Sequence, residues 1–401
     1  MRTAAIIIGL LFCTGVVLDA FQTIILPRRP VGRFRITRFF YVLTWLPWRA
    51  IARHTRNPKA REQLYSWYGP GSLLLLLMVW AVLLVAGFGL LFFGLHTPFA
   101  DAMADTSALA RFRTDLYVSG TTLFTLGIGD VLPRSLAARV LIVVESGTGL
   151  GFVALVIGYV PVLYNTFSRR EVAVALLDGR AGSPPTSTEL LRRHSFAGGQ
   201  EALVTLLAEW ERWSAEILES HISYPILCYY RSQHDNQSWL SALTAMLDSC
   251  AMLISVVPGA ASRQAQLTFA MGRHALVDLG HVFQIEAKEA ALRARGGPDR
   301  LPPANFERVC DLMLEANLRL CGDPEAPARL HALRALYEPQ AQALADYLGM
   351  SLPGWIPEPR AKDQWKTVEA VRSQAASVFK HKETVISPQA EALHLHADEH
   401  R

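Results

Sequence analysis

Residues 121–130 read Thr-Thr-Leu-Phe-Thr-Leu-Gly-Ile-Gly-Asp and lie alone between two long apolar segments. Within this stretch, Thr125 opens a Thr-x-Gly-x-Gly-Asp run whose glycines, Gly127 and Gly129, let consecutive backbone carbonyls turn toward one axis. Carbonyls arranged in this way replace the hydration shell of a permeating cation. The stretch therefore predicts a re-entrant pore loop, entered by a short helix expected over residues 110–124.

Three apolar runs surround the pore loop in the chain and predict an all-α membrane protein. They cover residues 4–26, 72–95 and 138–167. Each exceeds the roughly 20 residues needed to cross about 30 Å of hydrocarbon. The pore loop falls between the second and third runs, where a half-way helix and irregular backbone are tolerated if protein surrounds them.

The segment from about residue 72 to residue 167 resembles the pore domain of potassium channels, especially those with two pore-forming helices per subunit. Thr125-Leu126-Gly127-Ile128-Gly129 is similar to their Thr-Val-Gly-Tyr-Gly filter, and Asp130 follows at the expected place. Two positions depart from the family pattern. Ile128 replaces the usual aromatic residue, and Thr121 stands where many members carry a Glu that pairs with the Asp.

The resemblance implies an outer helix over 72–95, a pore helix and filter over 110–130, and an inner helix over 138–167. It also implies K⁺ as the ion bound at Thr125, Leu126, Gly127, Ile128 and Gly129, with no other cofactor. One pore loop cannot surround an ion, so we expect four copies of the chain around one axis. The first apolar run, 4–26, is then an additional N-terminal span.

Glu145 is the one carboxylate inside the third run, and such a group is costly in a membrane unless it faces water or a partner. Two interpretations remain open. Glu145 either hydrogen-bonds behind the filter near Thr121 and Thr122, supporting it together with Asp130, or it lines the cavity and concentrates cations.

The inner helix also contains residues that favour bending. Gly149 lies where the family has its hinge glycine, and Pro161 removes a helical hydrogen bond. We expect a gate there. The alternative for the glycines, Gly147 and Gly151 above all, is close helix packing.

Loop charges predict the topology. Residues 27–71 carry ten Lys/Arg and one acid, whereas 96–137 carry three Arg and four Asp. Positive charge marks the cytoplasmic side. We therefore expect a multi-pass protein of the cell membrane with its N-terminus outside, an uncleaved first span rather than a signal peptide, and a cytoplasmic C-terminal part. Asp19 in that span is expected to pair with a basic residue just beyond it, the alternative being a functional ionisable group. No span carries the regular Arg of a voltage sensor.

Residues 1–71 are expected to end in a basic connector with a short interfacial helix over 39–48. Trp45 and Trp48 would lie at headgroup level, and the basic residues within 28–61 would attract anionic lipids. Beyond the spans we expect a helical continuation and linker over 168–186, a cytoplasmic all-α domain over 187–382 and a disordered tail over 383–401. The tail carries His394, His396 and His400, which could bind a metal or reflect composition only.

Apolar periodicity in the C-terminal part predicts a set of helices. These cover 187–194, 200–220, 224–232, 236–256, 261–293, 303–320, 327–348 and 362–380. The pattern lacks the strands and glycine-rich turn of a dinucleotide sensor. The five cysteines show no metal-like spacing and are expected to be reduced.

Two polar groups in this part could carry chemistry. His274, Asp278 and His281 share one helix face at i, i+4 and i+7, which could supply metal ligands or form a polar face. Residues 231–239 form a dense polar run in which Asp235 or Asn236 resembles a helix N-cap. The alternative for that run is a small-ligand pocket with nearby aromatic and histidine side chains, namely His221, Tyr229 and Tyr230.

The sequence as a whole predicts a cation-selective, potassium-preferring channel whose inner-helix gate is controlled by the helical domain. The alternative is a membrane-anchored sensor or scaffold with a vestigial or non-selective pore. No nucleophile–base pair or metal-hydrolase motif indicates an enzyme, and no basic motif with interleaved aromatics indicates nucleic-acid binding.

Overall fold

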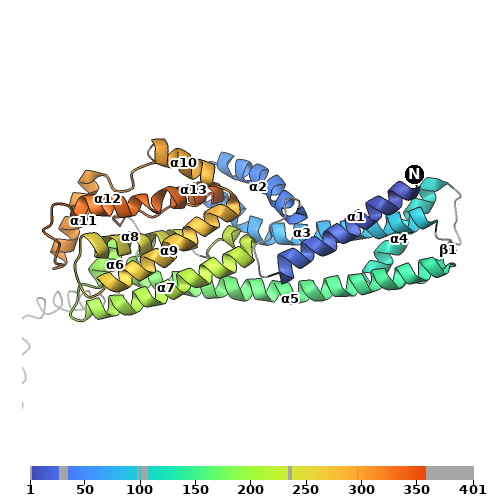
Figure 1. Ribbon diagram of the computed structural model, residues 1–401, viewed down its shortest axis with the longest axis horizontal. Helices are drawn as coiled ribbons and strands as arrows, with labels where there is room; N and C mark the ends of the chain where they lie inside the picture. The colour runs from blue at the N-terminus through green and yellow to red at the C-terminus, as the bar shows by residue number, and fades with distance from the viewer. Residues whose placement is uncertain are drawn as a thin grey trace, which may run out of the picture.

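The chain folds into an elongated all-α membrane protein, with the spans at one end and a helical bundle at the other (Figure 1). The computed structural model describes residues 2–26, 35–96, 99–100, 107–233, 237–295 and 297–357. Within them, three helices are long and apolar enough to cross a membrane: Arg2–Ile25, Pro58–Leu95 and Leu136–Ala181. The predicted fold class is confirmed.

The membrane end consists of four elements. α1 (Arg2–Ala20) is extended by the π-helical turn η1 (Phe21–Ile25), and α3 (Pro58–Leu95), α4 (Ala108–Leu123) and α5 (Leu136–Ala181) follow. α1 lies along α3 because small residues face each other. A Cβ atom at Gly9 would lie 2.6 Å from the Gly87 carbonyl oxygen, and one at Gly87 would lie 2.6 Å from Cys13 Sγ. Such small-residue contacts are the usual way for membrane helices to approach closely.

Asp19 at the end of α1 is buried, and one of its two carboxylate oxygens accepts hydrogen bonds. Its Oδ2 accepts hydrogen bonds from the Thr37 N–H at 3.0 Å, the Thr37 hydroxyl at 2.6 Å and the Trp80 indole N–H at 3.0 Å. Arg35 Nε lies 3.8 Å from Oδ1. The expected basic partner is therefore Arg35. Asp19 also joins α1 to Trp80 of α3 and to Thr37 at the start of the helix Ile36–His54.

α2 (Ile36–His54) leaves the membrane end and lies against the helical bundle (Figure 1). Trp45 is only 1% exposed, and its indole N–H donates to the Tyr347 carbonyl at 3.1 Å. Trp48 donates to the Leu64 carbonyl at 3.0 Å. The prediction that both indoles lie at headgroup level is wrong. Packing among the rings of Tyr68 and other aromatics offers these side chains greater burial than a membrane surface does.

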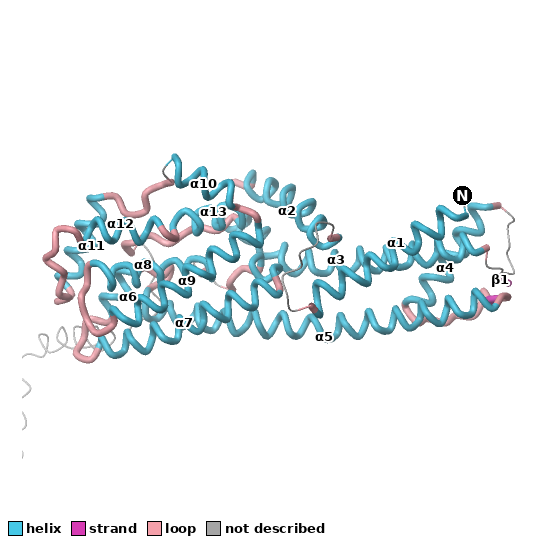
Figure 2. The backbone as a smooth tube through the Cα atoms, in the orientation of Figure 1, coloured by secondary structure: helices cyan, strands magenta, loops and turns pink. Residues whose placement is uncertain are grey.

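The bundle is helical throughout (Figure 2). Its elements are α6 (Ser187–Arg193), α7 (Gly199–Ser223), η2 (Pro225–Tyr229), α8 (Trp239–Ser255), α9 (Ser262–Phe283), α10 (Glu286–Arg295), α11 (Pro303–Glu315), α12 (Ala326–Ala335) and α13 (Glu338–Leu348). The short strands β1 (Phe99–Ala100) and β2 (Leu132–Pro133) pair antiparallel at the far end of the molecule.

Four predicted helices differ from the structure, and one of them, expected over 303–320, already ends at Glu315. The helix expected over 261–293 is divided by Gln284, whose φ of 54° ends α9 in the left-handed region. The helix expected over 327–348 is interrupted at Tyr337 and becomes α12 and α13. The one expected over 224–232 is the short 3₁₀ helix η2. The helix 362–380 and the tail 383–401 lie outside the described residues.

The bundle shares its core with helices from the membrane end. Buried side chains from α2, α3 and α5, among them Trp45, Tyr68 and Leu177, belong to the same apolar cluster as the bundle helices. α5 continues without interruption to Ala181, past the start of the linker expected within 168–186. One helix therefore runs from beside the filter loop into the bundle.

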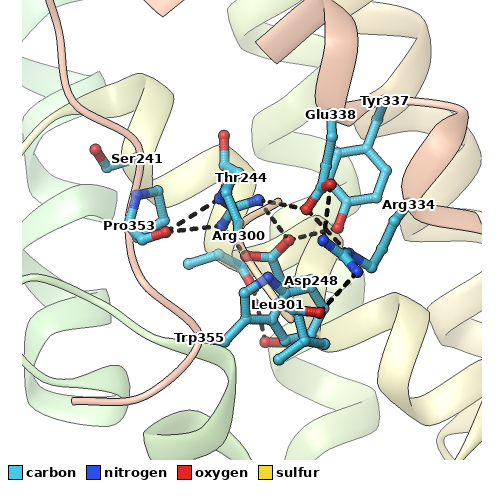
Figure 3. A network of polar contacts seen from close by, with 12 residues as sticks. Ser241, Thr244, Asp248, Arg300, Leu301, Arg334, Tyr337, Glu338, Pro353 and Trp355 are labelled. Carbon is cyan, nitrogen blue, oxygen red and sulfur yellow. Dashed lines mark hydrogen bonds and ion pairs between the residues drawn. The ribbon is translucent and has the colours of Figure 1, made fainter. Parts of the chain in front are cut away.

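A network of polar contacts lies within the bundle (Figure 3). The Arg300 guanidinium donates to both Asp248 carboxylate oxygens, at 3.1 and 2.5 Å, and the Tyr337 hydroxyl also donates to Asp248. Arg300 also binds the Pro353 carbonyl at 2.8 Å, and Arg334 binds Glu338. The network holds the segment after α13 across α8.

Candidate ion-conducting site

α4 leads into residues 125–130, the predicted filter, which we call the filter loop. The Ser107 hydroxyl caps its start by accepting from the Ala110 N–H at 3.2 Å. At its end the Phe124 N–H donates to the Gly120 carbonyl and the Leu126 N–H donates to the Thr121 carbonyl at 2.8 Å. The observed helix, Ala108–Leu123, agrees with the predicted pore helix. Its C-terminal partial negative charge lies directly before the filter and favours a cation.

The filter backbone alternates in φ. Thr125, Gly127 and Gly129 have positive values of 56°, 56° and 78°, whereas Leu126 and Ile128 between them do not. A row of carbonyls along one side of the chain needs such an alternation, because a regular strand points them to opposite sides. A threonine in the left-handed region costs about 1–2 kcal/mol, so its presence marks a functional constraint.

Asp130, directly after the filter, is held by a residue that the sequence reasoning missed. The Tyr117 hydroxyl donates to Asp130 Oδ2 at 2.8 Å. The Thr121 hydroxyl does not hydrogen-bond to Asp130, because it donates to the Val118 carbonyl of its own helix. The available signal was spacing: Tyr117 lies one helical turn before Thr121, on the same side of α4.

Glu145 on α5 is fully buried against the pore helix. Its Oε1 lies 2.5 Å from the Ser119 hydroxyl, and that hydroxyl also lies 2.9 Å from the Val85 carbonyl oxygen of α3. Glu145 therefore lies behind the pore helix and does not line a cavity. Its partner is Ser119 rather than Thr121 or Thr122, because Ser119 is on the face of α4 turned toward α3 and α5.

Gly149 permits the closest approach of α5 to α4. A Cβ atom there would lie 2.0 Å from the Leu123 carbonyl oxygen. Around Gly147 and Gly151, by contrast, an added Cβ would meet nothing within 4 Å among the described residues. Gly149 thus has a packing role, and its role as a hinge stays a prediction. Pro161 lies inside the uninterrupted helix α5.

A cavity of about 550 Å³ separates α5 from α1 on the other side of the inner helix. Val16 and Val17 of α1, Leu84 of α3, and Thr148 and Gly151 of α5 contribute to its apolar lining. The cavity lies beside α5 at the level of Gly151.

Apolar side chains around the filter are exposed in the single chain. Leu126 and Ile128 are 62% and 59% exposed. On α5, an exposed stripe recurs every seven residues at Val143, Leu150, Ile157 and Tyr164. A seven-residue repeat of apolar positions is typical of helices that pack on other helices. These surfaces lack partners within one chain.

Arg170 near the end of α5 joins the inner helix to the bundle. It is 3% exposed and donates to the Leu227 carbonyl at 2.8 Å, the Tyr230 carbonyl at 2.9 Å and His221 Nε2 at 3.2 Å. Burial, and then the Arg170 charge, hold the pKa of His221 well below its usual value. The imidazole is neutral, as its accepting Nε2 requires.

The proposed small-ligand pocket is filled by protein. His221 is fully buried, and the Tyr229 hydroxyl pairs with the Tyr347 hydroxyl at 3.2 Å. Tyr230 packs against Gly69. Asp235 and Asn236 lie outside the described residues, and the N-cap of α8 is Ser238, which accepts from the Ser241 N–H at 3.1 Å. The predicted cap is therefore wrong.

The predicted metal ligands share a face but do not form a metal site. His274 Nε2 and His281 Nδ1 lie 3.8 and 3.9 Å from Asp278 carboxylate oxygens. Over the described part of the chain, no group of three or more His, Cys, Asp or Glu side chains is arranged to hold a metal ion. His394, His396 and His400 are outside that part. All five cysteines are free thiols, as predicted.

Comparisons with known proteins agree with this geometry. Residues 77–163 match the family model described as an ion channel. The matched region begins within α3 and ends within α5, so it includes the complete pore helix and filter loop. The chain is also 27% identical over 256 residues to an uncharacterized membrane protein, YdjJ, of Bacillus subtilis strain 168, covering 62% of this chain and 69% of that protein. No solved structure matches significantly.

Proposed function

We propose that the protein is a potassium-selective channel that conducts passively as a homotetramer. The alternation of φ at Thr125, Gly127 and Gly129 carries this proposal, because a row of carbonyls requires such an alternation and the helix dipole of α4 ends at the same place. The ion-channel match over residues 77–163 supports it. K⁺ in the filter is the only bound ion that the proposal requires.

The exposed apolar surfaces support assembly as a tetramer. Leu126 and Ile128 would pack against neighbouring pore modules, and the stripe at Val143, Leu150, Ile157 and Tyr164 would pack against neighbouring inner helices. An exposed apolar surface of this kind marks an interaction site. A filter built from one loop per chain becomes a closed ring only with several copies around it.

The proposed topology follows from loop charge. Residues 27–71 are strongly basic, so the N-terminus lies outside the cell membrane and the helical bundle lies in the cytoplasm. The exposed apolar side chains of α2, Phe39 and Leu43, together with the basic residues within 28–61, would then meet lipid at the cytoplasmic surface. Anionic lipids are the expected partners of that basic segment.

The bundle would control the gate through α5. Arg170 is fixed to the Leu227 and Tyr230 carbonyls, so a shift of η2 pulls on the same helix that carries Gly149 and Pro161. Because α5 is continuous from the filter level to the bundle, such a shift reaches the inner helix without an intervening loop. An unidentified small ligand of the bundle would act along this route.

The direct test is ion flux from the purified full-length chain reconstituted in liposomes, in K⁺ and in Na⁺. Gly127→Ala places a side chain at φ 56°, where only glycine is unstrained, and is expected to abolish K⁺ flux. Gly71→Ala in α3 is the matched control, because its Cβ meets nothing within 4 Å. It is expected to conduct like the unmodified chain.

Equal fluxes of K⁺ and Na⁺ would contradict potassium selectivity. Absence of K⁺ flux under all conditions would favour a membrane-anchored sensor or scaffold with a vestigial pore. Cross-linking of the reconstituted protein measures the number of subunits independently of conduction.

A further inference from the structure

We infer that Glu145 is a neutral carboxylic acid, and that its proton locks the pore helix to the helices on either side. The lock would release when alkaline pH removes this proton. The proton's position follows from hydrogen bonding in one chain, whereas its effect on conduction rests on the proposed channel function.

The position of the proton follows from a count of donors around Ser119. The Ser119 hydroxyl has one proton, yet it lies within hydrogen-bonding distance of two oxygens, the Val85 carbonyl at 2.9 Å and Glu145 Oε1 at 2.5 Å. A backbone carbonyl can only accept. When the hydroxyl donates to Val85, the contact with Glu145 needs a second proton, and only the carboxyl group can supply it. Glu145 then donates to Ser119 Oγ.

The surroundings favour the neutral form. Glu145 is fully buried, and its Oε2 has no hydrogen-bond partner. No Lys, Arg or His within the described residues forms an ion pair with it. An isolated buried carboxylate is far more costly than a buried neutral acid. A short O···O contact of 2.5 Å between an acid and a hydroxyl fits a strong donor.

The titratable groups facing Glu145 give the charge no compensation. From α1, the Cys13 thiol is the group whose electrostatics couple to Glu145. α3 contributes the Val85 carbonyl, whose dipole repels a carboxylate. On α4 the next carboxyl is Asp115, one turn before Ser119, and the cation acting on it is Arg111. The Cys13 thiol is neutral, the Val85 carbonyl repels a negative charge and Arg111 acts on Asp115, so none of these neighbours supplies a positive charge to Glu145.

The lock joins three helices at one hydroxyl. With the proton present, α5 donates to Ser119 of α4, and Ser119 donates to Val85 of α3. Once Glu145 is ionised, the Ser119 proton can serve only one acceptor, so one of the two links is lost. The filter begins at Thr125, six residues beyond Ser119. Loss of the proton would therefore loosen the helix that positions the filter.

The proton can be detected without conduction, by infrared spectroscopy of the full-length protein in membranes. We expect a carboxylic-acid carbonyl band at neutral pH that disappears in Glu145→Gln and shifts in Ser119→Ala, which removes its acceptor. Asp115→Asn is the matched control, because it removes a nearby buried carboxyl and should leave the Glu145 band in place. A Glu145 carboxylate band at neutral pH would overturn the inference, even in a protein that conducts K⁺.

The lock is tested by the pH dependence of K⁺ flux and of thermal unfolding, each normalised to its own value at neutral pH. The unmodified chain should lose both as pH rises and Glu145 ionises, whereas Glu145→Gln, whose amide keeps a donor for Ser119 and cannot ionise, should show neither loss. Identical alkaline losses in both proteins would refute the lock. If no variant conducts, the channel proposal fails, and the unfolding curves and the infrared band still decide the inference.

Discussion

Two fully buried carboxyl groups, Asp248 in the helical bundle and Glu145 in the membrane end, have opposite surroundings. Asp248 receives two hydrogen bonds from Arg300 and one from Tyr337. Glu145 has the single partner Ser119 and an unpartnered Oε2. Their burial is the same, but only Asp248 has a cation beside it.

The difference shows how each end of the molecule offsets the free-energy cost of burying a carboxyl group. In the bundle, burial lowers the pKa of Arg300, but the nearby Asp248 and Glu338 carboxylates raise it by more, so the Arg300 guanidinium stays charged beside Asp248. The membrane end provides no cation for Glu145, so a proton neutralises it instead. A bidentate ion pair is a permanent tie, whereas a proton can leave. We therefore assign a structural role to Asp248 and a switchable one to Glu145.

The largest effect is expected from breaking the bundle's ion pair. Asp248→Asn removes the carboxylate that binds both ends of the buried Arg300 guanidinium and leaves Glu338, 3.0 Å away, as its remaining anionic partner, which should destabilise the protein by about 3 kcal/mol. Chemical denaturation of the full-length protein in detergent measures this. The matched control is Asp323→Asn, which removes an exposed ion pair with Arg329 and should change nothing measurable. Equal effects of both changes would show that burial is not what gives Asp248 its role.

A smaller effect is expected at Asp19, which lies between the two extremes. Asp19→Asn keeps an oxygen that can accept from Thr37 and Trp80 but loses the charge beside Arg35, so we expect a loss of about 1–3 kcal/mol. The same denaturation experiment applies. A loss of stability as large as that of Asp248→Asn would show that Asp19 contributes mainly through its charge, as Asp248 does.

The next effect is the pH dependence of stability that arises from two buried histidines, His221 beside Arg170 and His194 at the end of α6. Burial lowers the pKa values of His221 and His194 below the unfolded value of 6.5, so the unfolded chain binds more protons below that pH. Their contribution to stability is present above pH 6.5 and is lost as pH falls. Each contributes a slope of up to about 1.4 kcal/mol per pH unit.

Unfolding measured between pH 5 and pH 7.5 should show this slope, and His221→Gln should remove the share that belongs to His221. The direction is opposite to that expected for Glu145, whose lock fails at alkaline pH. An unchanged slope in His221→Gln would mean that His221 is charged in the folded protein, against its contact with Arg170.

The smallest effect is expected from Glu145→Gln at neutral pH. Because a neutral amide replaces a neutral acid and keeps a donor for Ser119, the change should be below about 1 kcal/mol. A loss of stability comparable to that of Asp248→Asn would indicate that Glu145 is ionised and paired. The two carboxyl groups would then not differ in the way described above.

Much of the membrane end could be predicted from local sequence. The pore helix before Thr125 and the three spans follow from composition and length, and the filter follows from glycine positions. The partner of Glu145 could not be predicted, because whether α4 turns Ser119 or Thr121 toward α5 depends on helix rotation. Tyr117 was missed for the same reason. Trp45 was misplaced because an amphipathic aromatic helix fits a membrane surface and a protein groove equally well.

The sequence by itself determined that this is an all-α membrane protein with a glycine-containing loop between its last two spans, because apolar length and the φ freedom of glycine act locally. Only the tertiary structure decided which polar groups meet: Glu145 with Ser119, Asp130 with Tyr117 and Arg170 with His221. Each of these pairs joins residues 13 to 51 positions apart on different elements. Their meeting depends on how helices pack and rotate against one another, which no local pattern specifies.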